Sequence, residues 1–121
     1  MNASLTTGQV LEILTLDIRQ GKRDEFHQLY VTEALPLLLK WRFRVLAYGP
    51  SLHDENSYYI IRLFKSLEDR QASEDAYYTS EDWKKGPRDA ILSLVEHFAY
   101  AVVSSVTWNE VSGALQGTAA L

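Results

Sequence analysis

Cysteine is absent from the 121 residues of the sequence, and glycine and proline are scarce, with six and three residues. The absence of cysteine excludes disulfides, a thiolate nucleophile and Cys-ligated zinc or iron–sulfur clusters. The sequence also lacks a glycine-rich phosphate loop, a Gly-x-Ser-x-Gly elbow and any His-x-x-x-His or His-x-x-Glu-His spacing. We therefore expect neither nucleotide hydrolysis nor serine hydrolysis, no metal site within the chain and no cofactor.

An excess of positive charge is also lacking, because 16 acidic and 12 basic residues give a formal net charge of -4. The basic pairs Lys22-Arg23 and Lys84-Lys85 stand beside acidic residues, so we expect no nucleic-acid partner. No apolar run approaches the ~18 residues of a membrane span, and residues 1–8 lack the features of a secretory signal. These absences predict a cytoplasmic protein with no membrane partner.

Hydrophobic residues make up 46% of the chain, which is typical of a globular protein, and the length fits one domain. We assign this single domain to residues 1–110. Residues 111–121 carry no charge and are rich in small side chains, so we expect them to form a flexible or partner-dependent tail.

The hydrophobic pattern alternates between β-branched or aromatic runs and runs with helical spacing. Pro36 lies within the first helical run, so we expect a kink near residues 33–35 or a break into two helices. Ser66 is placed to cap a later helix, residues 79–82 offer a second capped start, and Gly86-Pro87 interrupts the helical run that begins there. The expected elements are a strand at 9–18, a helix at 22–41, a hairpin of strands at 43–48 and 57–65, a helix at 66–77, two helical pieces before residue 96 and a strand at 98–108.

This order of strand, helix, strand, strand, helix and strand predicts an α+β fold of the ferredoxin-like βαββαβ type. Such a fold has a four-stranded antiparallel sheet with helices on one face. The runs Tyr58–Phe64 and Phe98–Val103 are apolar at both alternating positions, so we expect both sheet faces to be buried. The helices can cover only one face. A second, identical sheet is the most economical cover for the other face, so we predict a homodimer.

Four short motifs occur in order along the sequence. They are Leu-Glu-Ile-Leu-Thr-Leu at 11–16, Glu-Ala-Leu-Pro-Leu-Leu at 33–38, Ser-Leu-Glu-Asp-Arg at 66–70 and Ser-Glu-Asp-Trp at 80–83. Their order and spacing resemble those of the NIPSNAP family, within the dimeric α+β barrel superfamily, over about residues 10–106. Leu11, Leu14 and Leu16 stand where that family commonly has Tyr, Arg and Tyr, so no polar site on the first strand is carried over.

The resemblance implies a dimeric α+β barrel but no single activity. The superfamily includes cofactor-free monooxygenases, haem-degrading enzymes, small-molecule lyases and non-enzymatic binders, and a fold alone does not select among them. In the proteins that it resembles, ligands typically lie in a cleft between the sheet and the helices.

Arg62 is the strongest candidate for a functional residue, because its guanidinium group lies in the middle of an otherwise apolar strand. Such a group requires a carboxylate, a carbonyl or a ligand. One interpretation is a structural ion pair, and the other is capture of an anionic or enolate oxygen in the cleft. The other candidates for binding a substrate are Tyr48, Tyr58, Trp83, Tyr100 and His27. The aromatic members could equally be core or dimer-interface packing.

Two functions remain open at this point. The first is a homodimeric binding protein for a small apolar or aromatic molecule, with no assigned activity. The second is a cofactor-free monooxygenase, isomerase or cyclase acting on a small aromatic or polyketide-like substrate. In the enzyme, Arg62 would stabilise developing negative charge while a His or Tyr moves a proton. An Arg62 fully paired with a carboxylate, together with no cavity beside it, would exclude the enzyme.

Overall fold

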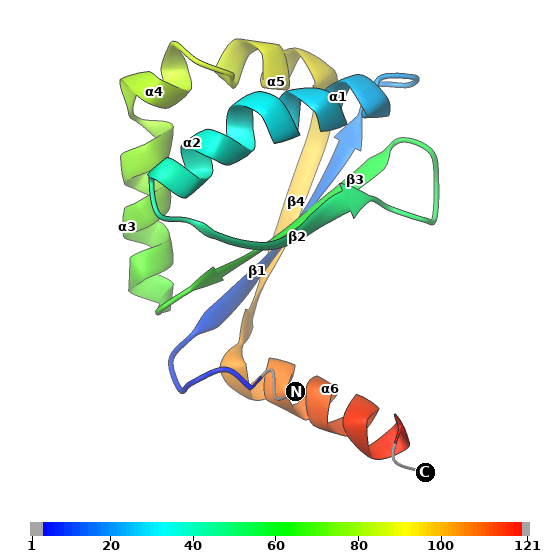
Figure 1. Cartoon of the computed structure of the whole chain (residues 1–121), viewed down its shortest axis with the longest axis vertical. Helices are drawn as coiled ribbons and strands as arrows, with labels where there is room; N and C mark the ends of the chain where they lie inside the picture. The colour runs from blue at the N-terminus through cyan, green and yellow to red at the C-terminus, as the bar shows by residue number, and fades with distance from the viewer. Residues whose placement is uncertain (1–3, 120–121) are drawn as a thin grey trace.

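A computed structural model describes residues 4–119 and shows an α+β fold built on one antiparallel sheet (Figure 1). The strands are β1 (Val10–Ile18), β2 (Arg44–Pro50), β3 (Ser57–Phe64) and β4 (Val95–Ser104). Their order across the sheet is β2-β3-β1-β4, and every neighbouring pair is antiparallel. The prediction of a ferredoxin-like α+β fold with a four-stranded antiparallel sheet is therefore confirmed.

Helices α1 to α5 all lie on one side of this sheet, whereas α6 extends away from the end of β4 (Figure 1). The helices are α1 (Arg23–Leu29), the π-helix η1 (Tyr30–Ala34), α2 (Leu35–Lys40), α3 (Leu67–Tyr78), α4 (Glu81–Lys84), α5 (Arg88–Leu94) and α6 (Ser105–Ala119). Among the described residues, none of these helices is both long enough and apolar enough to cross a membrane.

The expected break in the first helical run is a turn of π-helix. The backbone N–H of Leu35 donates to the carbonyl of Tyr30, five residues earlier, which is the defining bond of that geometry. Pro36 lies in the first turn of α2, where its missing N–H removes no bond within that helix. The helical run therefore divides into two α-helices, one of the two predicted outcomes, with the π-helical turn of residues 30–34 between them.

The two capped helix starts are also confirmed. The Ser66 side chain accepts a hydrogen bond from the backbone N–H of Asp69, and that of Ser80 accepts one from Trp83. Gly86-Pro87 separates α4 from α5, as the sequence predicts. Each Ser oxygen satisfies a donor that the first helical turn would otherwise leave without a partner.

Three strand boundaries differ by two or more residues from the sequence prediction, and one of them is the start of β4, at Val95 rather than at 98. The second strand continues through Gly49 and Pro50, which is possible because β2 lies at the edge of the sheet. The last strand ends at Ser104 rather than Trp108, because α6 begins at Ser105 and includes most of the expected tail. The last two residues of that tail, 120 and 121, lie outside the described residues.

The two faces of the sheet have different surroundings. Side chains at even positions of β1 and β3, such as Leu16, Tyr58 and Ile60, point toward the helices and form the core. On the opposite face, which we call the open face, Ile13 of β1 lies between Ile61 of β3 and Ala101 of β4. None of the helices α1 to α5 covers the open face (Figure 1).

Candidate functional site

A cavity of about 380 Å³, which we call the main cavity, lies between the helix-covered face of the sheet and helices α3, α4 and α5. The strands contribute Glu12, Leu14, Leu16, Arg62, Val95, Phe98 and Tyr100 to its wall. The wall is largely apolar toward Leu16 and Phe98 and charged at Glu12. Because a strand rises about 3.3 Å per residue, Glu12 and Leu16 are about 13 Å apart along β1.

The charged end of the main cavity is a closed ring of ion pairs, which we call the ionic cluster. Glu12 accepts hydrogen bonds from Nε of Arg62 and from Nε of Arg70, each at 2.7 Å. Glu74 contacts the same two guanidinium groups, at 3.1 Å to Arg62 and 3.4 Å to Arg70. Tyr78 accepts a further hydrogen bond from Arg62 at 3.1 Å. Each carboxylate therefore bridges both arginines.

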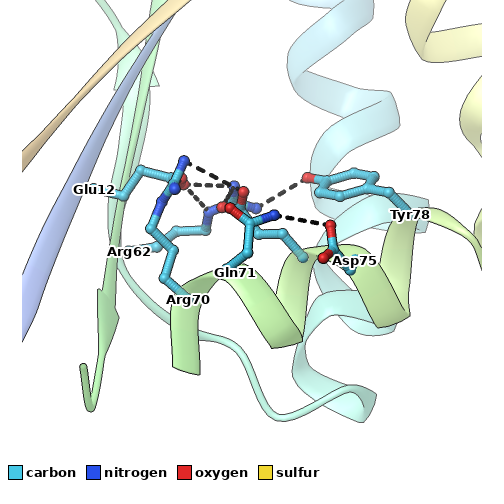
Figure 2. Close-up of polar contacts among 7 residues, drawn as sticks. Glu12, Arg62, Arg70, Gln71, Asp75 and Tyr78 are labelled. Atoms are coloured by element: carbon cyan, nitrogen blue, oxygen red, sulfur yellow. Dashed lines mark hydrogen bonds and ion pairs between the residues drawn. The ribbon is translucent and has the colours of Figure 1, made fainter. Parts of the chain in front are cut away.

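The local fold explains why these side chains meet. Glu12 and Arg62 are direct cross-strand partners in the β1–β3 register, on the face that the helices cover. Arg70 and Glu74 are one turn apart on α3, so both project from the same side of that helix. Figure 2 shows Glu12 and Arg62 reaching from the sheet toward Arg70 and Tyr78 on α3.

The two carboxyl groups of the ionic cluster have opposite pKa shifts. Burial alone would raise the pKa of Glu12, but hydrogen bonds with Glu74 and the arginines, and the charge of Arg62, hold it below its ordinary value. For Glu74, burial and the hydrogen bond and charge of Glu12 raise the pKa to about 7, against the lowering effect of the arginines. Glu74 is thus a cavity-lining carboxyl group that can exchange a proton near neutral pH.

The structure brings three of the six candidate residues to the main cavity. Arg62, Trp83 and Tyr100 line it, and the ring of Tyr100 lies 4.7 Å from the guanidinium carbon of Arg70. Arg62 is paired with carboxylates, as the structural interpretation requires, and a cavity also lies beside it. An enzyme would have been excluded by a fully paired Arg62 with no cavity beside it. Because the cavity is there, that exclusion does not apply.

The other three candidates form a separate aromatic group beneath α1. Nδ1 of His27 lies 2.7 Å from the hydroxyl oxygen of Tyr58, whose ring packs against Phe26, and the ring of His27 lies 6.2 Å from that of Tyr48. Tyr58 shares a face with Arg62, but four residues separate them by about 13 Å along β3. Tyr48 lies on β2, at the opposite edge of the sheet from Tyr100.

Sequence reasoning missed Glu12, Arg70, Glu74 and Tyr78. Glu12 carries the same signal that identified Arg62, because it is a charged residue within an apolar strand. When two apolar strands each contain one charged residue and the charges are opposite, the two residues are expected to pair. Arg70 and Glu74 are an i,i+4 pair like many on exposed helices, so the sequence alone does not distinguish their burial.

No protein-family model and no curated protein matches this sequence. Among solved structures, an uncharacterised NIPSNAP-like domain protein from Burkholderia xenovorans superposes with a TM-score of 0.75 at 18% identity, over 81% of this chain and 85% of that one. A NIPSNAP family protein of unknown function from Agrobacterium tumefaciens also has a TM-score of 0.75 at 18% identity, over 84% and 91% of the two chains. The chain has a NIPSNAP-like fold.

The NIPSNAP-like fold is shared more distantly with a protein of another description. A structure from Bordetella bronchiseptica, provisionally described as an antibiotic biosynthesis monooxygenase, has a TM-score of 0.65 at 16% identity, over 80% and 96% of the two chains. Identities this low establish the fold and no activity. The function of this NIPSNAP-like chain therefore has to be argued from its own site.

Proposed function

We propose that the protein is a homodimeric binding protein for a small, largely apolar or aromatic molecule, which occupies the main cavity. The observation that carries this proposal is an apolar cavity of about 380 Å³ that ends at a buried ionic cluster. This volume is within the range of small-molecule sites, which are mostly apolar and contain few polar groups. The cytoplasmic location expected from the sequence stays a prediction.

The shape of the cavity favours a flat, elongated ligand. Its walls run along β1 for about 13 Å, which suits a molecule with two fused rings. Trp83 and Phe98 offer aromatic surfaces, and the 66% exposure of the Phe98 side chain indicates that the cavity opens at the β4 edge. A bound ring system would cover this exposed apolar surface, and the hydrophobic effect would stabilise the complex.

The charges at the inner end favour a ligand without a strong charge of its own. When both carboxyl groups are ionised, Glu12 and Glu74 balance Arg62 and Arg70, and protonation of Glu74 leaves one net positive charge. A buried cation would find no free carboxylate there, whereas a neutral or weakly acidic group would lie beside donors that are already fixed in place.

A cofactor-free enzyme is the second candidate, and one specific observation favours it. Glu74 lines the main cavity, and burial together with the nearby Glu12 raises its pKa to about 7. A carboxyl group with such a pKa can serve as a general acid or base at neutral pH. The carboxyl of Glu74 would then move the proton, in place of the His or Tyr expected from the sequence.

The proposed homodimer rests on the open face and on α6. On the open face, Ile13 and Ile61 are partly buried and Ala101 is exposed in the single chain, and none of the helices α1 to α5 covers this face. Helix α6 packs mainly against the ends of β4 and β1, and its Val106 and Leu115 are 62% and 66% exposed. A helix of this length is marginally stable alone in water, so a second copy is the expected cover for both surfaces.

Ligand binding can be tested with 2-acetylnaphthalene as the probe, using its fluorescence in a titration. We expect saturable binding to the unmodified protein and at least tenfold weaker binding to Leu92→Trp. Leu92 lies in the cavity wall at 50% exposure, so the indole ring would fill part of the cavity without disturbing the core.

Leu39→Trp is the matched control, because Leu39 is similarly exposed, at 56%, on α2 and does not line the main cavity. This variant should bind the probe as the unmodified protein does. Equal weakening in both variants would contradict binding in the main cavity, as would the absence of saturable binding to the unmodified protein.

The dimer can be tested by sedimentation equilibrium at micromolar concentration. We expect a mass of twice 13.8 kDa, and a monomer for Ala101→Glu, which places a charge on the open face beside Ile13. Leu39→Glu, on the helix side of the molecule, should remain a dimer. A monomeric unmodified protein would contradict the proposed cover of the open face.

A further inference from the structure

A second, smaller cavity of about 70 Å³, which we call the inner cavity, lies deeper in the core. It shares Arg62, Tyr78 and Trp83 with the wall of the main cavity, so the two spaces lie side by side. Its other walls include Tyr30 and Tyr77, which do not line the main cavity. This volume is too small for an aromatic ring and fits a group of two or three non-hydrogen atoms.

The hydroxyl groups of Tyr30 and Tyr77 have no hydrogen-bond partner among the described residues, although both are buried. The two residues are 3% and 1% exposed. Buried polar groups are normally hydrogen-bonded, and each one without a partner costs free energy. Two residues that carry such hydroxyls line the same cavity, and this requires an explanation.

The backbone beside this cavity is also unusual. Tyr30 and Ala34 are the first and last residues of the π-helix η1, and both line the inner cavity. The extra residue in a π-helical turn widens the helix, and such turns occur frequently at functional sites. The π-helix therefore sets the position of Tyr30.

We propose that the inner cavity is a subsite for the uncharged oxygen of the ligand, a ketone carbonyl or a hydroxyl, which hydrogen-bonds to Tyr30 and Tyr77. This inference rests on the proposed function, because the ring system of the same ligand fills the main cavity. Burial raises the pKa of both tyrosines, so their hydroxyls remain neutral donors. Glu12 already pairs with Arg62 at the junction of the cavities, so the oxygen that enters need not carry a charge.

The test compares 2-acetylnaphthalene with 2-isopropylnaphthalene, which has nearly the same shape but no carbonyl oxygen. For the unmodified protein, we expect the ketone to bind about tenfold more tightly, the effect of about 1.4 kcal/mol of hydrogen bonding. In the double variant Tyr30→Phe/Tyr77→Phe, the two dissociation constants should become equal, while that of the hydrocarbon stays within twofold. Removing two hydroxyls that lack partners should not impair folding.

Tyr59→Phe is the control, because Tyr59 lies on β3 with its side chain on the open face and lines neither cavity. It should retain the preference for the ketone. If both probes bind the unmodified protein equally, or if the double variant keeps the preference, the inner cavity is not an oxygen subsite although the main cavity binds ligands. If neither probe binds, the proposed function itself fails.

Discussion

Replacing Glu12 by glutamine is expected to lower the free energy of unfolding by about 3–5 kcal/mol, which is typical when one partner of a buried ion pair is removed. The Glu12 side chain is 1% exposed and accepts hydrogen bonds from both Arg62 and Arg70. Without its charge, two buried guanidinium groups would share Glu74 alone. Urea denaturation at pH 7, monitored by tryptophan fluorescence at one protein concentration, measures the change.

Glu25→Gln is the matched control, because Glu25 is 62% exposed and pairs only loosely with Lys22 at 3.5 Å. Its loss should cost less than about 1 kcal/mol. The double variant Glu12→Leu/Arg62→Met should be less destabilised than the sum of its single variants, because it removes both charges of one pair. A cost for Glu12→Gln as small as that of the control would mean that water already reaches the ionic cluster.

Most of the fold could be predicted from the sequence, because its signals are local. Strands β1 and β3, the caps at Ser66 and Ser80, and the break near Pro36 each depend on neighbouring residues. The end of β4 could not be predicted in this way. Residues 105–108 are β-branched or aromatic in part, yet they begin α6, so local strand propensity was the wrong guide there.

The site was predicted less completely, because it depends on strand order and on distance along the strands. Arg62 and Tyr58 are four residues apart on β3, so alternation puts them on one face of the sheet. Alternation does not indicate that α1 covers Tyr58 whereas α3 covers Arg62. The missed partner Glu12 could have been found by the argument that identified Arg62, because Glu12 is also a charged residue within an apolar strand. The burial of Arg70 and Glu74 depends on how α3 packs, which no pattern within α3 reveals.

The contacts of Arg62 agree with its structural interpretation, whereas capture of an anionic or enolate oxygen stays a prediction. Its guanidinium group is held by Glu12, Glu74 and Tyr78, so it is a structural ion-pair partner. The same pairing fixes its position at the junction of the main and inner cavities. A rigid, charge-balanced group of this kind can orient a neutral ligand without a cost for reorganising the site.

The free energy of unfolding of the unmodified protein is expected to fall as the pH rises from 5.5 to 8. This fall should be larger than that of Glu74→Gln by about 1–3 kcal/mol. Burial and the nearby Glu12 raise the pKa of Glu74 to about 7 in the folded protein, against an ordinary value of 4.5. Between these values the folded protein holds a proton that the unfolded chain has released. This contribution is complete below pH 4.5 and is lost as the pH rises through 7.

Urea denaturation at several pH values, with both proteins at the same concentration, measures this difference. The amide of glutamine resembles the protonated carboxyl group in shape and can still donate a hydrogen bond to Glu12. Glu74→Gln should therefore fold and lose only the pH-dependent contribution of Glu74 to stability. Glu12 does not contribute to the pH dependence between pH 5.5 and 8, because its lowered pKa affects stability only below about pH 4.5. Equal slopes for the two proteins would mean that Glu74 is already ionised at pH 5.5, and the ionic cluster would then have no proton to offer a ligand.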